Sequence, residues 1–376
     1  MNPTHHITNL ANAFARRPVA RDPNAPLRIR FVYATDGAPA RYRVHSQIEQ
    51  AHLAGMLADA VRIDQPEQLY DLTHCDLLIF YRMPLGPRTA ALLLLAHRYG
   101  IRTAFDSDDL TWDVRQRDYE FLDRHYDPAS ITRILRTARR TAILMRHTDA
   151  LIFSTPFLAG MARAAFERPT FVCMNALSAE LISRSELAYR RTTPNDSIVR
   201  IGYFSGQARS HDEDLASVGE PLANTLAQFP QAILTVCGEV ALPSALAAYR
   251  ERIEWRPSVD WRALPHEIAR VDVNIAPLID NPQRRGKSGI KYLEAALVGV
   301  PTIASHLEPY ADVILEQRSG LLAQSPEQWQ AALALLIENQ ALRQQIGRAA
   351  YTHVLTEHST AARAPHLAEI LQAMMV

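Results

Sequence analysis

Short apolar runs alternate with helical patterns along almost the whole chain, and this alternation constrains the fold more than any other feature. Residues 76–81 (DLLIFY) are apolar at nearly every position, as a strand covered on both faces requires. Similar β-branched or aromatic runs, separated mostly by helical patterns, occupy residues 28–34, 57–63, 101–105, 150–153 and 170–173. The first half is therefore predicted to be a parallel sheet with helices on both faces.

The same alternation restarts after a polar segment at residues 190–196. Further strands are predicted at residues 199–204, 232–237, 271–276 and 302–304, helices at 212–229, 244–252 and 261–268, and helical, amphipathic structure from residue 326 onward. We therefore predict an α/β protein with two doubly wound, Rossmann-like domains facing a cleft, and a helical C-terminal tail. The predicted boundaries are an N-terminal extension over 1–25, a first domain over 26–176, a linker over 177–197, a second domain over 198–357, and a C-terminal helix over 358–376 that can pack back on the first domain.

The composition is that of an ordinary globular protein. The 376 residues are 48% hydrophobic and 21% charged with a formal net charge of zero, so no global field favours nucleic acid as a partner. The three cysteines, Cys75, Cys173 and Cys237, are odd in number and lie in apolar contexts. They are interpreted as buried thiols rather than disulfides or metal ligands, which predicts a cytoplasmic protein without a metal site.

The N-terminal extension has apolar residues at helical spacing beside two arginines. Ile7, Leu10, Ala13 and Phe14 form this pattern, which is typical of a helix lying on a membrane surface. A helix packed on the domain or a disordered lead-in explains it at least as well. Peripheral contact with the inner membrane is therefore one hypothesis for this region.

Residues 287–305 (KSGIKYLEAALVGVPTIAS) combine a basic turn, a helix and a buried strand. Ser288 is suited to cap the helix, and Gly299 is suited to end it. Lys287, Lys291 and Glu294 share one helix face, where the lysines favour an anionic ligand such as a diphosphate and the glutamate can accept from sugar hydroxyls. A surface helix with a Lys291–Glu294 ion pair explains the same residues equally well.

Two neighbouring segments add to the candidate ligand site of the second domain. Ser205, Gly206, Arg209 and His211 follow the first predicted strand of that domain, where small residues let a phosphate approach the backbone. A plain strand-to-helix turn is the alternative. Arg285, just before Lys287, adds a guanidinium suited to phosphate oxygens.

In the first domain, charged residues follow two predicted strands. Arg41 and Arg43 come after the first strand and are candidates to hold an anionic acceptor. Asp108 is a candidate general base and Asp109 a candidate acceptor-side residue, although both aspartates can simply cap a helix. A Mg²⁺ site on Asp106 and Asp108 is a weak alternative, since such pairs are common without metal.

The second half resembles the donor-binding domain of glycosyltransferases with the GT-B fold, most of all the family-4-like enzymes of bacterial surface polysaccharide assembly. The matching segments, in the family's order, are IGYFSG (201–206) with His211 and Asp214, CGE (237–239), DVNIAPL (272–278), NPQRRGKSGIKYLEAALVGVPTIAS (281–305) and LEPY (307–310). The first half resembles the family's acceptor domain only through residues 41–43 and 106–109.

The resemblance implies a nucleotide-diphosphate sugar as co-substrate, with no separate cofactor and no metal. It assigns the diphosphate to Lys287 with Arg285 and Lys291, and the ribose to Glu294. Ser205, Gly206, Arg209, Ser288 and Glu308 complete the implied donor site, and Lys287, Asp108 and His211 are the candidate catalytic residues. The family pattern has a second glutamate eight residues before Glu294, but this sequence has Gly286 there, so His211 or Glu308 would have to contact the sugar instead.

The implied activity is retaining transfer of a hexose or deoxyhexose to a saccharide or lipid-linked acceptor, in polysaccharide or glycoconjugate assembly. Two alternatives stay open: a non-catalytic scaffold with this fold, and an inverting enzyme with a first-domain carboxylate as base. A nicotinamide-dependent enzyme is disfavoured because residues 34–38 (ATDGA) lack the glycine spacing of a dinucleotide site. The sequence predicts no particular oligomeric state.

Overall fold

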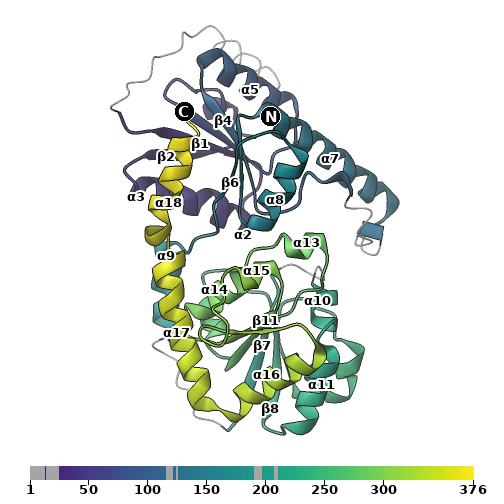
Figure 1. The fold of residues 1–376 in the computed structure, drawn as a ribbon. Helices are drawn as coiled ribbons and strands as arrows, with labels where there is room; N and C mark the ends of the chain where they lie inside the picture. Colours follow the sequence, from purple (N-terminus) through teal and green to yellow (C-terminus); the bar gives the residue numbers. More distant parts are fainter. Residues whose placement is uncertain (1–12, 14–24, 116–121, 124–125, 190–196, 207–210) are drawn as a thin grey trace. The chain divides into compact units, whose positions relative to one another are not determined.

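The computed structural model describes residue 13 and residues 25–115, 122–123, 126–189, 197–206 and 211–376. The chain divides into two compact units (Figure 1). One unit comprises residues 1–176 together with 360–376, and the other comprises residues 177–359. No helix among the described residues is both long enough and apolar enough to cross a membrane.

The first unit is built on a parallel sheet with strand order β2-β1-β3-β4-β5-β6. Its strands are β1 Arg28–Tyr33, β2 Leu57–Arg62, β3 Leu77–Tyr81, β4 Arg102–Ser107, β5 Ala150–Phe153 and β6 Thr170–Val172. Its helices are α2 Ala38–Ala40, the π-helical turn η1 Arg41–His45, α3 Ser46–Leu53, α4 Pro66–Leu69, α5 Pro87–Tyr99, α7 Pro128–His147, α8 Pro156–Ala165 and α18 Thr360–Ala373.

Both faces of this sheet are covered, because successive side chains of each strand point to opposite sides. On β3, Leu78 and Phe80 pack in one core with helices α5 and α8, while Leu77 and Ile79 pack in another with Leu371 of α18. Helix α18 lies along α3 (Figure 1), so the last residues of the chain complete the core of the first unit.

The second unit also has a six-stranded parallel sheet, with order β12-β11-β10-β7-β8-β9. Its strands are β7 Val199–Phe204, β8 Ala232–Cys237, β9 Ile253–Arg256, β10 Val273–Ala276, β11 Thr302–Ser305 and β12 Leu321–Ala323. Its helices are α9 Ala179–Tyr189, α10 Asp212–Ala216, α11 Gly219–Gln228, the 3₁₀ helix η3 Ser244–Arg252, α12 Leu264–Ile268, α13 Pro282–Arg285, α14 Ile290–Ala296, α15 Glu308–Ala311, α16 Pro326–Glu338 and α17 Gln340–His358.

The predicted fold class is confirmed: each unit is a doubly wound parallel sheet, and the C-terminal segment is helical. Some local predictions are wrong. Residues 179–189 of the predicted linker form α9, whose Leu181 and Ala188 are buried, so this segment belongs to the second unit. The helix predicted over 212–229 breaks between α10 and α11, and the C-terminal helix starts at Thr360 rather than residue 358.

Strands β9 and β12, at the two edges of the sheet, were not predicted. The four residues of β9 (IEWR) alternate apolar and charged side chains, and β12 (LLA) is only three residues long. The polar segment at residues 190–196 lies outside the described residues. The same holds for the predicted N-terminal extension, apart from Ala13 and residue 25, so the membrane hypothesis for that region stays a prediction.

Candidate active site

The second sheet changes its winding direction between β7 and β10, the two neighbouring strands from which the chain proceeds to opposite edges. In open α/β sheets, ligands bind beyond the carboxyl ends of the strands at such a point. The described residues that follow these two strands are 205–206 and 211, before α10, and 277–289, before α14. Most of the predicted donor-binding residues lie in these segments.

Asp214, on α10, connects the two segments through hydrogen bonds to its carboxylate. Its carboxylate is fully buried and accepts hydrogen bonds from Nδ1 of His211 (2.7 Å), the backbone N–H of Ile279 (3.1 Å) and Nε of Arg284 (3.2 Å). Burial raises the pKa of Asp214, but His211 and Arg284 lower it more, so the net pKa lies below its usual value. Arg284 is itself buried, and its guanidinium pairs with Asp214 inside the unit. This ion pair connects α13 to α10.

His211 is a neutral imidazole at physiological pH. Burial lowers its pKa to about 4, although its hydrogen bond to Asp214 acts in the opposite direction. A neutral ring that donates from Nδ1 to Asp214 has a lone pair on Nε2, which can accept a hydroxyl proton. His211 is therefore suited to orient a sugar hydroxyl and unsuited to donate a proton as an imidazolium.

Lys291 is the most unusual group of this site. Its Nζ atom is buried, lies 4.3 Å from the ring centroid of Tyr203, and forms no hydrogen bond with any residue that the structure describes. Burial lowers the pKa of the amine to about 8, while the negative charges of Asp214 and Glu294 partly compensate. A buried ammonium without a hydrogen-bond acceptor is costly, so this position favours binding of an anion.

The sequence contains a signal for this site that our sequence analysis missed. Among its 40 basic residues, only Lys287 and Lys291 are lysines, and the other 38 are arginines. A chain that uses arginine almost everywhere else has two lysines within five residues of each other, next to the switch point. The compact ammonium group, rather than the planar guanidinium, is what distinguishes these two positions.

Ser288 does not cap the helix. Helix α14 starts at Ile290 with Gly289 as its N-cap residue, and no side chain caps it. A Cβ atom on Gly289 would lie 2.6 Å from the carbonyl oxygen of Pro309, so glycine lets α14 approach α15 closely. Lys287, Ser288 and Glu294 are half-buried, and the backbone N–H of Lys287 donates to the carbonyl of Arg284.

Arg285 and Glu308 form an ion pair with each other. Nη1 of Arg285 lies 3.0 Å from Oε1 of Glu308, and its Nε lies 2.6 Å from Oδ1 of Asp280. These carboxylates raise the pKa of the guanidinium. All three side chains are at least one-third exposed, so the pairs are weak and a competing phosphate can replace them.

Ser205 and Gly206 follow β7 at the carboxyl edge, and Ser205 is buried. Gly238 packs against this turn: it has φ of +109°, and a Cβ there would lie 2.1 Å from the Ser205 carbonyl oxygen. Arg209 lies outside the described residues. Gly286 has φ of −76°, a conformation open to any L-residue, so the glutamate of the family pattern is absent without any backbone requirement for glycine.

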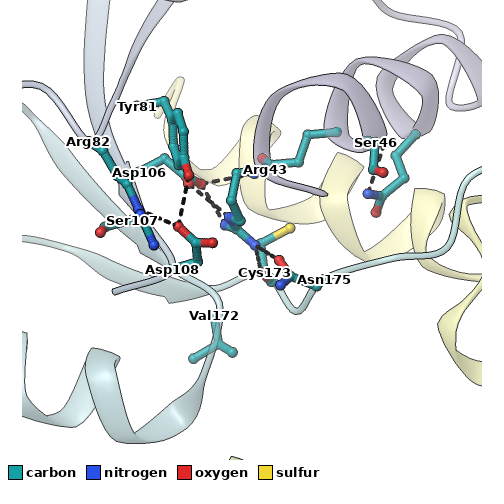
Figure 2. A network of polar contacts seen from close by, with 12 residues as sticks. Arg43, Ser46, Tyr81, Arg82, Asp106, Ser107, Asp108, Val172, Cys173 and Asn175 are labelled. Atoms are coloured by element: carbon teal, nitrogen blue, oxygen red, sulfur yellow. Dashed lines mark hydrogen bonds and ion pairs between the residues drawn. The ribbon is translucent and has the colours of Figure 1, made fainter. Parts of the chain in front are cut away.

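The charged residues predicted for the first unit form a different kind of network, shown in Figure 2. Arg43 has no exposed side-chain surface; it binds both carboxylate oxygens of Asp106 (2.9 and 2.6 Å), the carbonyl of Cys173 and the side chain of Asn175. Gln47 donates a further hydrogen bond to Asp106. The structure therefore corrects the acceptor-binding prediction for Arg43, which lies in the core and joins η1, β4 and the segment after β6.

Arg82, which follows β3, forms ion pairs with Asp108 and Asp109. Its Nε lies 2.6 Å from Oδ1 of Asp108 (Figure 2). Its Nη2 lies 3.1 Å from Oδ2 of Asp109. The hydroxyl of Tyr81 also donates to Asp108. Arg82 adopts φ of +48°, which is uncommon for a residue with a side chain and costs roughly 1 kcal/mol.

Both contacts fall on Oδ1 of Asp108, so Tyr81 and Arg82 fix the orientation of this carboxylate. Arg82 connects both aspartates, and no sequence pattern predicted this role. Arg41 is half-buried and stacks on the ring of Tyr42, 4.7 Å from its centroid. The described residues include no group of three or more His, Cys, Asp or Glu side chains arranged to hold a metal ion.

Comparison with solved structures defines the fold class of the whole chain. A glycosyltransferase from Rickettsia africae aligns over 93% of this chain and 99% of its own, with a TM-score of 0.66 and 10% sequence identity. The Anabaena protein HepE, solved in complex with UDP-glucose, aligns over 92% of this chain and 100% of its own, with a TM-score of 0.57 and 14% identity. The chain thus has the GT-B fold, as the sequence resemblance implied.

Comparison of sequences finds similarity to glycosyltransferases over part of the chain, mainly in the second unit. Residues 219–369 match the model of a family described as glycosyl transferase-like. A 140-residue segment is 29% identical to D-inositol 3-phosphate glycosyltransferase of Segniliparus rotundus, and this match covers 35% of this chain. The chain spans about a third of that relative, 31% of its length.

Proposed function

We propose that this protein is a glycosyltransferase that binds a nucleotide-diphosphate sugar at the carboxyl edge of the second sheet. The observation that carries the proposal is the buried Nζ of Lys291, which has no hydrogen-bond partner among the described residues although it lies at the switch point. A diphosphate supplies the acceptor oxygens and negative charge that this ammonium group lacks. The UDP-glucose bound by the structurally similar HepE supports the same ligand class.

The reaction that fits these residues is transfer of a hexose or deoxyhexose to a hydroxyl of a saccharide or lipid-linked acceptor. As the bond from the anomeric carbon to the diphosphate breaks, negative charge grows on the leaving phosphate. Lys287 and Lys291 then stabilise the transition state more than the ground state. Glu294 accepts from the ribose hydroxyls, and the neutral His211 orients a hydroxyl of the sugar.

Retention of the anomeric configuration is the stereochemical outcome we propose. An inverting mechanism needs a base beside the acceptor hydroxyl, and both predicted carboxylate candidates, Asp108 and Asp109, pair with Arg82. We further propose that the lysines replace a metal ion, so that EDTA leaves the rate unchanged. A role in polysaccharide or glycoconjugate assembly, in a family-4-like enzyme, follows from the sequence resemblance alone.

Calorimetric titration with UDP, GDP, UDP-glucose and GDP-mannose tests the donor site. The wild-type protein should bind at least one nucleoside diphosphate, and Glu294→Ala should weaken binding about tenfold through loss of a hydrogen bond to the ribose. Glu338→Ala, which changes an exposed glutamate at the end of α16, is the matched control and should bind like the wild type. Absence of binding in the wild type would rule out the proposal.

Turnover separates the enzyme from the scaffold alternative. Phosphorus NMR should show slow release of nucleoside diphosphate from the bound nucleotide sugar, and proton NMR of the released sugar or glycoside should show the donor's anomeric configuration. Nucleotide-sugar binding without any release of diphosphate would favour the scaffold. Release with inverted configuration would favour a first-unit base.

A further inference from the structure

Tyr203 contacts two of the residues that the proposed donor site uses. It is the last residue but one of β7, a strand at the switch point, and its side chain has no exposed surface. It alternates with Val199 and Ile201 on the face of the strand that builds the main core of the second unit. The position of its ring is therefore fixed by the same apolar packing that stabilises the sheet.

The first contact is between the ring of Tyr203 and the amine of Lys291. Nζ of Lys291 lies 4.3 Å from the ring centroid, within the distance at which the face of an aromatic ring attracts a cation. The ring stabilises the positive charge but, unlike a carboxylate, it neither neutralises the ammonium nor takes up its N–H groups. These N–H groups therefore remain available to an anionic ligand.

The charged groups around Lys291 do not replace this contact. The negative charges of Asp214 and Glu294 favour the charged amine and Arg284 disfavours it, while burial has the largest effect and lowers the pKa to about 8. The carboxylate of Asp214 accepts its hydrogen bonds from other groups. The ring of Tyr203 is thus a direct contact through which the fold favours the charged form of Lys291.

The second contact is between the hydroxyl of Tyr203 and the backbone of His211. The hydroxyl donates to the carbonyl oxygen of His211 at a distance of 3.1 Å. Burial raises the pKa of Tyr203 well above its usual value, so the hydroxyl keeps the proton that this hydrogen bond requires. Asp214 binds the neutral imidazole of the same residue at Nδ1. The position of Nε2 of His211 therefore depends on both contacts.

We infer that Tyr203 is a positioning residue of the donor site, with its ring acting on Lys291 and its hydroxyl acting on His211. This role rests on the proposed function, in which Lys291 binds the diphosphate and His211 orients a hydroxyl of the sugar. The ring stabilises the ammonium before the diphosphate binds, and the hydroxyl holds the backbone from which the imidazole extends. The two contacts therefore affect different parts of the donor, and substitutions can separate them.

NMR of the free protein labelled with ¹³C-lysine tests the ring contact without any nucleotide. The ring current of Tyr203 should shift the ε-methylene protons of Lys291 upfield of those of Lys287, in the wild type and in Tyr203→Phe alike. Tyr203→Met fills much of the same volume without a ring. In this variant the upfield shift should disappear, and the titration midpoint of Lys291 should fall by about one unit. Equal shifts for the two lysines in the wild type, or an unchanged or higher midpoint in Tyr203→Met, would overturn the inference.

Calorimetric titration with UDP and UDP-glucose separates the two contacts, and GDP and GDP-mannose replace them if the wild type binds only those. Tyr203→Phe should bind UDP like the wild type but UDP-glucose about fivefold more weakly, because the backbone of His211 loses one hydrogen bond. Tyr203→Met should bind both more weakly, and the pH above which its UDP affinity falls should be about one unit lower than in the wild type. Tyr249→Phe, which removes the hydroxyl of a half-buried tyrosine on η3, is the matched control and should leave both affinities unchanged.

Circular dichroism and the melting temperature establish that the variants are folded. If Tyr203→Met does not fold, the upfield shift in the wild type and in Tyr203→Phe decides the ring contact. Equal affinity of Tyr203→Phe and the wild type for UDP-glucose would overturn the role of the hydroxyl, as would a parallel loss of affinity for UDP and UDP-glucose. Absence of nucleotide binding by the wild type would overturn the proposed function and this role with it, whereas the other contrary results overturn only the role of Tyr203.

Discussion

The carboxyl edges of both sheets carry charged residues, but the buried charges at the two edges differ in their hydrogen-bond partners. In the first unit the guanidinium of Arg43 donates hydrogen bonds to Asp106, Cys173 and Asn175. Arg82 forms ion pairs with Asp108 and Asp109. In the second unit the buried amine of Lys291 has no hydrogen-bond partner among the described residues. A buried ion pair that is fully hydrogen-bonded, as in the first unit, needs no ligand. A buried charge without a hydrogen-bond acceptor, as in the second unit, indicates a ligand.

The largest effect should come from breaking the buried pair of the first unit. Asp106→Ala leaves Arg43 charged and buried, which should destabilise this unit by about 3 to 5 kcal/mol. Hydrogen exchange should rise in peptides of β4 and β5 but not in those of β7 and β10. The variant Asp106→Leu/Arg43→Met, which removes both charges, should recover much of the loss. A change below about 1 kcal/mol in Asp106→Ala would show that the pair is not a structural element.

The reverse effect on stability is expected for Lys291. Because its pKa is lowered from 10.5 to about 8, the charged form is disfavoured in the folded state. Lys291→Met should therefore raise the free energy of unfolding at pH 7 by about 1 to 3 kcal/mol, and it should weaken UDP binding by about 2 kcal/mol or more. Lys287→Met is the matched control for stability. A lower free energy of unfolding in Lys291→Met than in the wild type would contradict the claim that the buried ammonium destabilises the free protein.

The pH dependence of donor binding follows from the same amine. With a pKa of about 8 in the free protein, Lys291 is about nine-tenths protonated at pH 7 and loses its charge as the pH rises. The affinity for UDP should be nearly constant from pH 6.5 to 7.5 and then fall by up to about tenfold per unit above pH 8. Titrations in buffers of different ionisation enthalpy should show proton uptake that grows toward one per UDP at pH 9.

His211 should contribute nothing to this profile between pH 5 and 8, because its pKa is about 4. An inflection near pH 6.5 that His211→Asn removes would show that the imidazole titrates at its ordinary value and that the buried Asp214 contact is not as described.

The smallest effect on stability is expected for the exposed ion pair between Arg285 and Glu308. Glu308→Gln removes one partner of Arg285 but leaves Asp280, so the free energy of unfolding should change by less than about 1 kcal/mol. UDP affinity should stay the same or rise slightly, since the guanidinium becomes more available to phosphate. A tenfold loss of affinity for UDP-glucose relative to UDP would instead assign Glu308 to the donor sugar, in place of the glutamate missing at Gly286.

The sequence allowed prediction of the sheets because their central strands are continuous apolar runs, such as residues 76–81 in β3. Edge strand β9 lacks such a run, edge strand β12 has only three residues, and both were missed. For the site, the positions of Lys291 and Glu294 on one helix were predictable from helical spacing, whereas Lys287, predicted on the same helix face, lies before α14, which starts at Ile290. The sequence could not predict which charged side chains form ion pairs, because Arg43 and Asp106 are 63 residues apart and Arg284 and Asp214 are 70 apart. Only the folded chain brings these groups together.

The two lysines of the chain permit a direct test of the central claim, that Lys291 is a buried ammonium awaiting an anion. Protein labelled with ¹³C-lysine should give two ε-methylene signals, one of which Lys287→Arg removes. We predict that the remaining Lys291 signal titrates near pH 8 in the free protein and above pH 10 when UDP is bound. Titration near the ordinary value of 10.5 in the free protein, with no change on addition of UDP, would contradict the account.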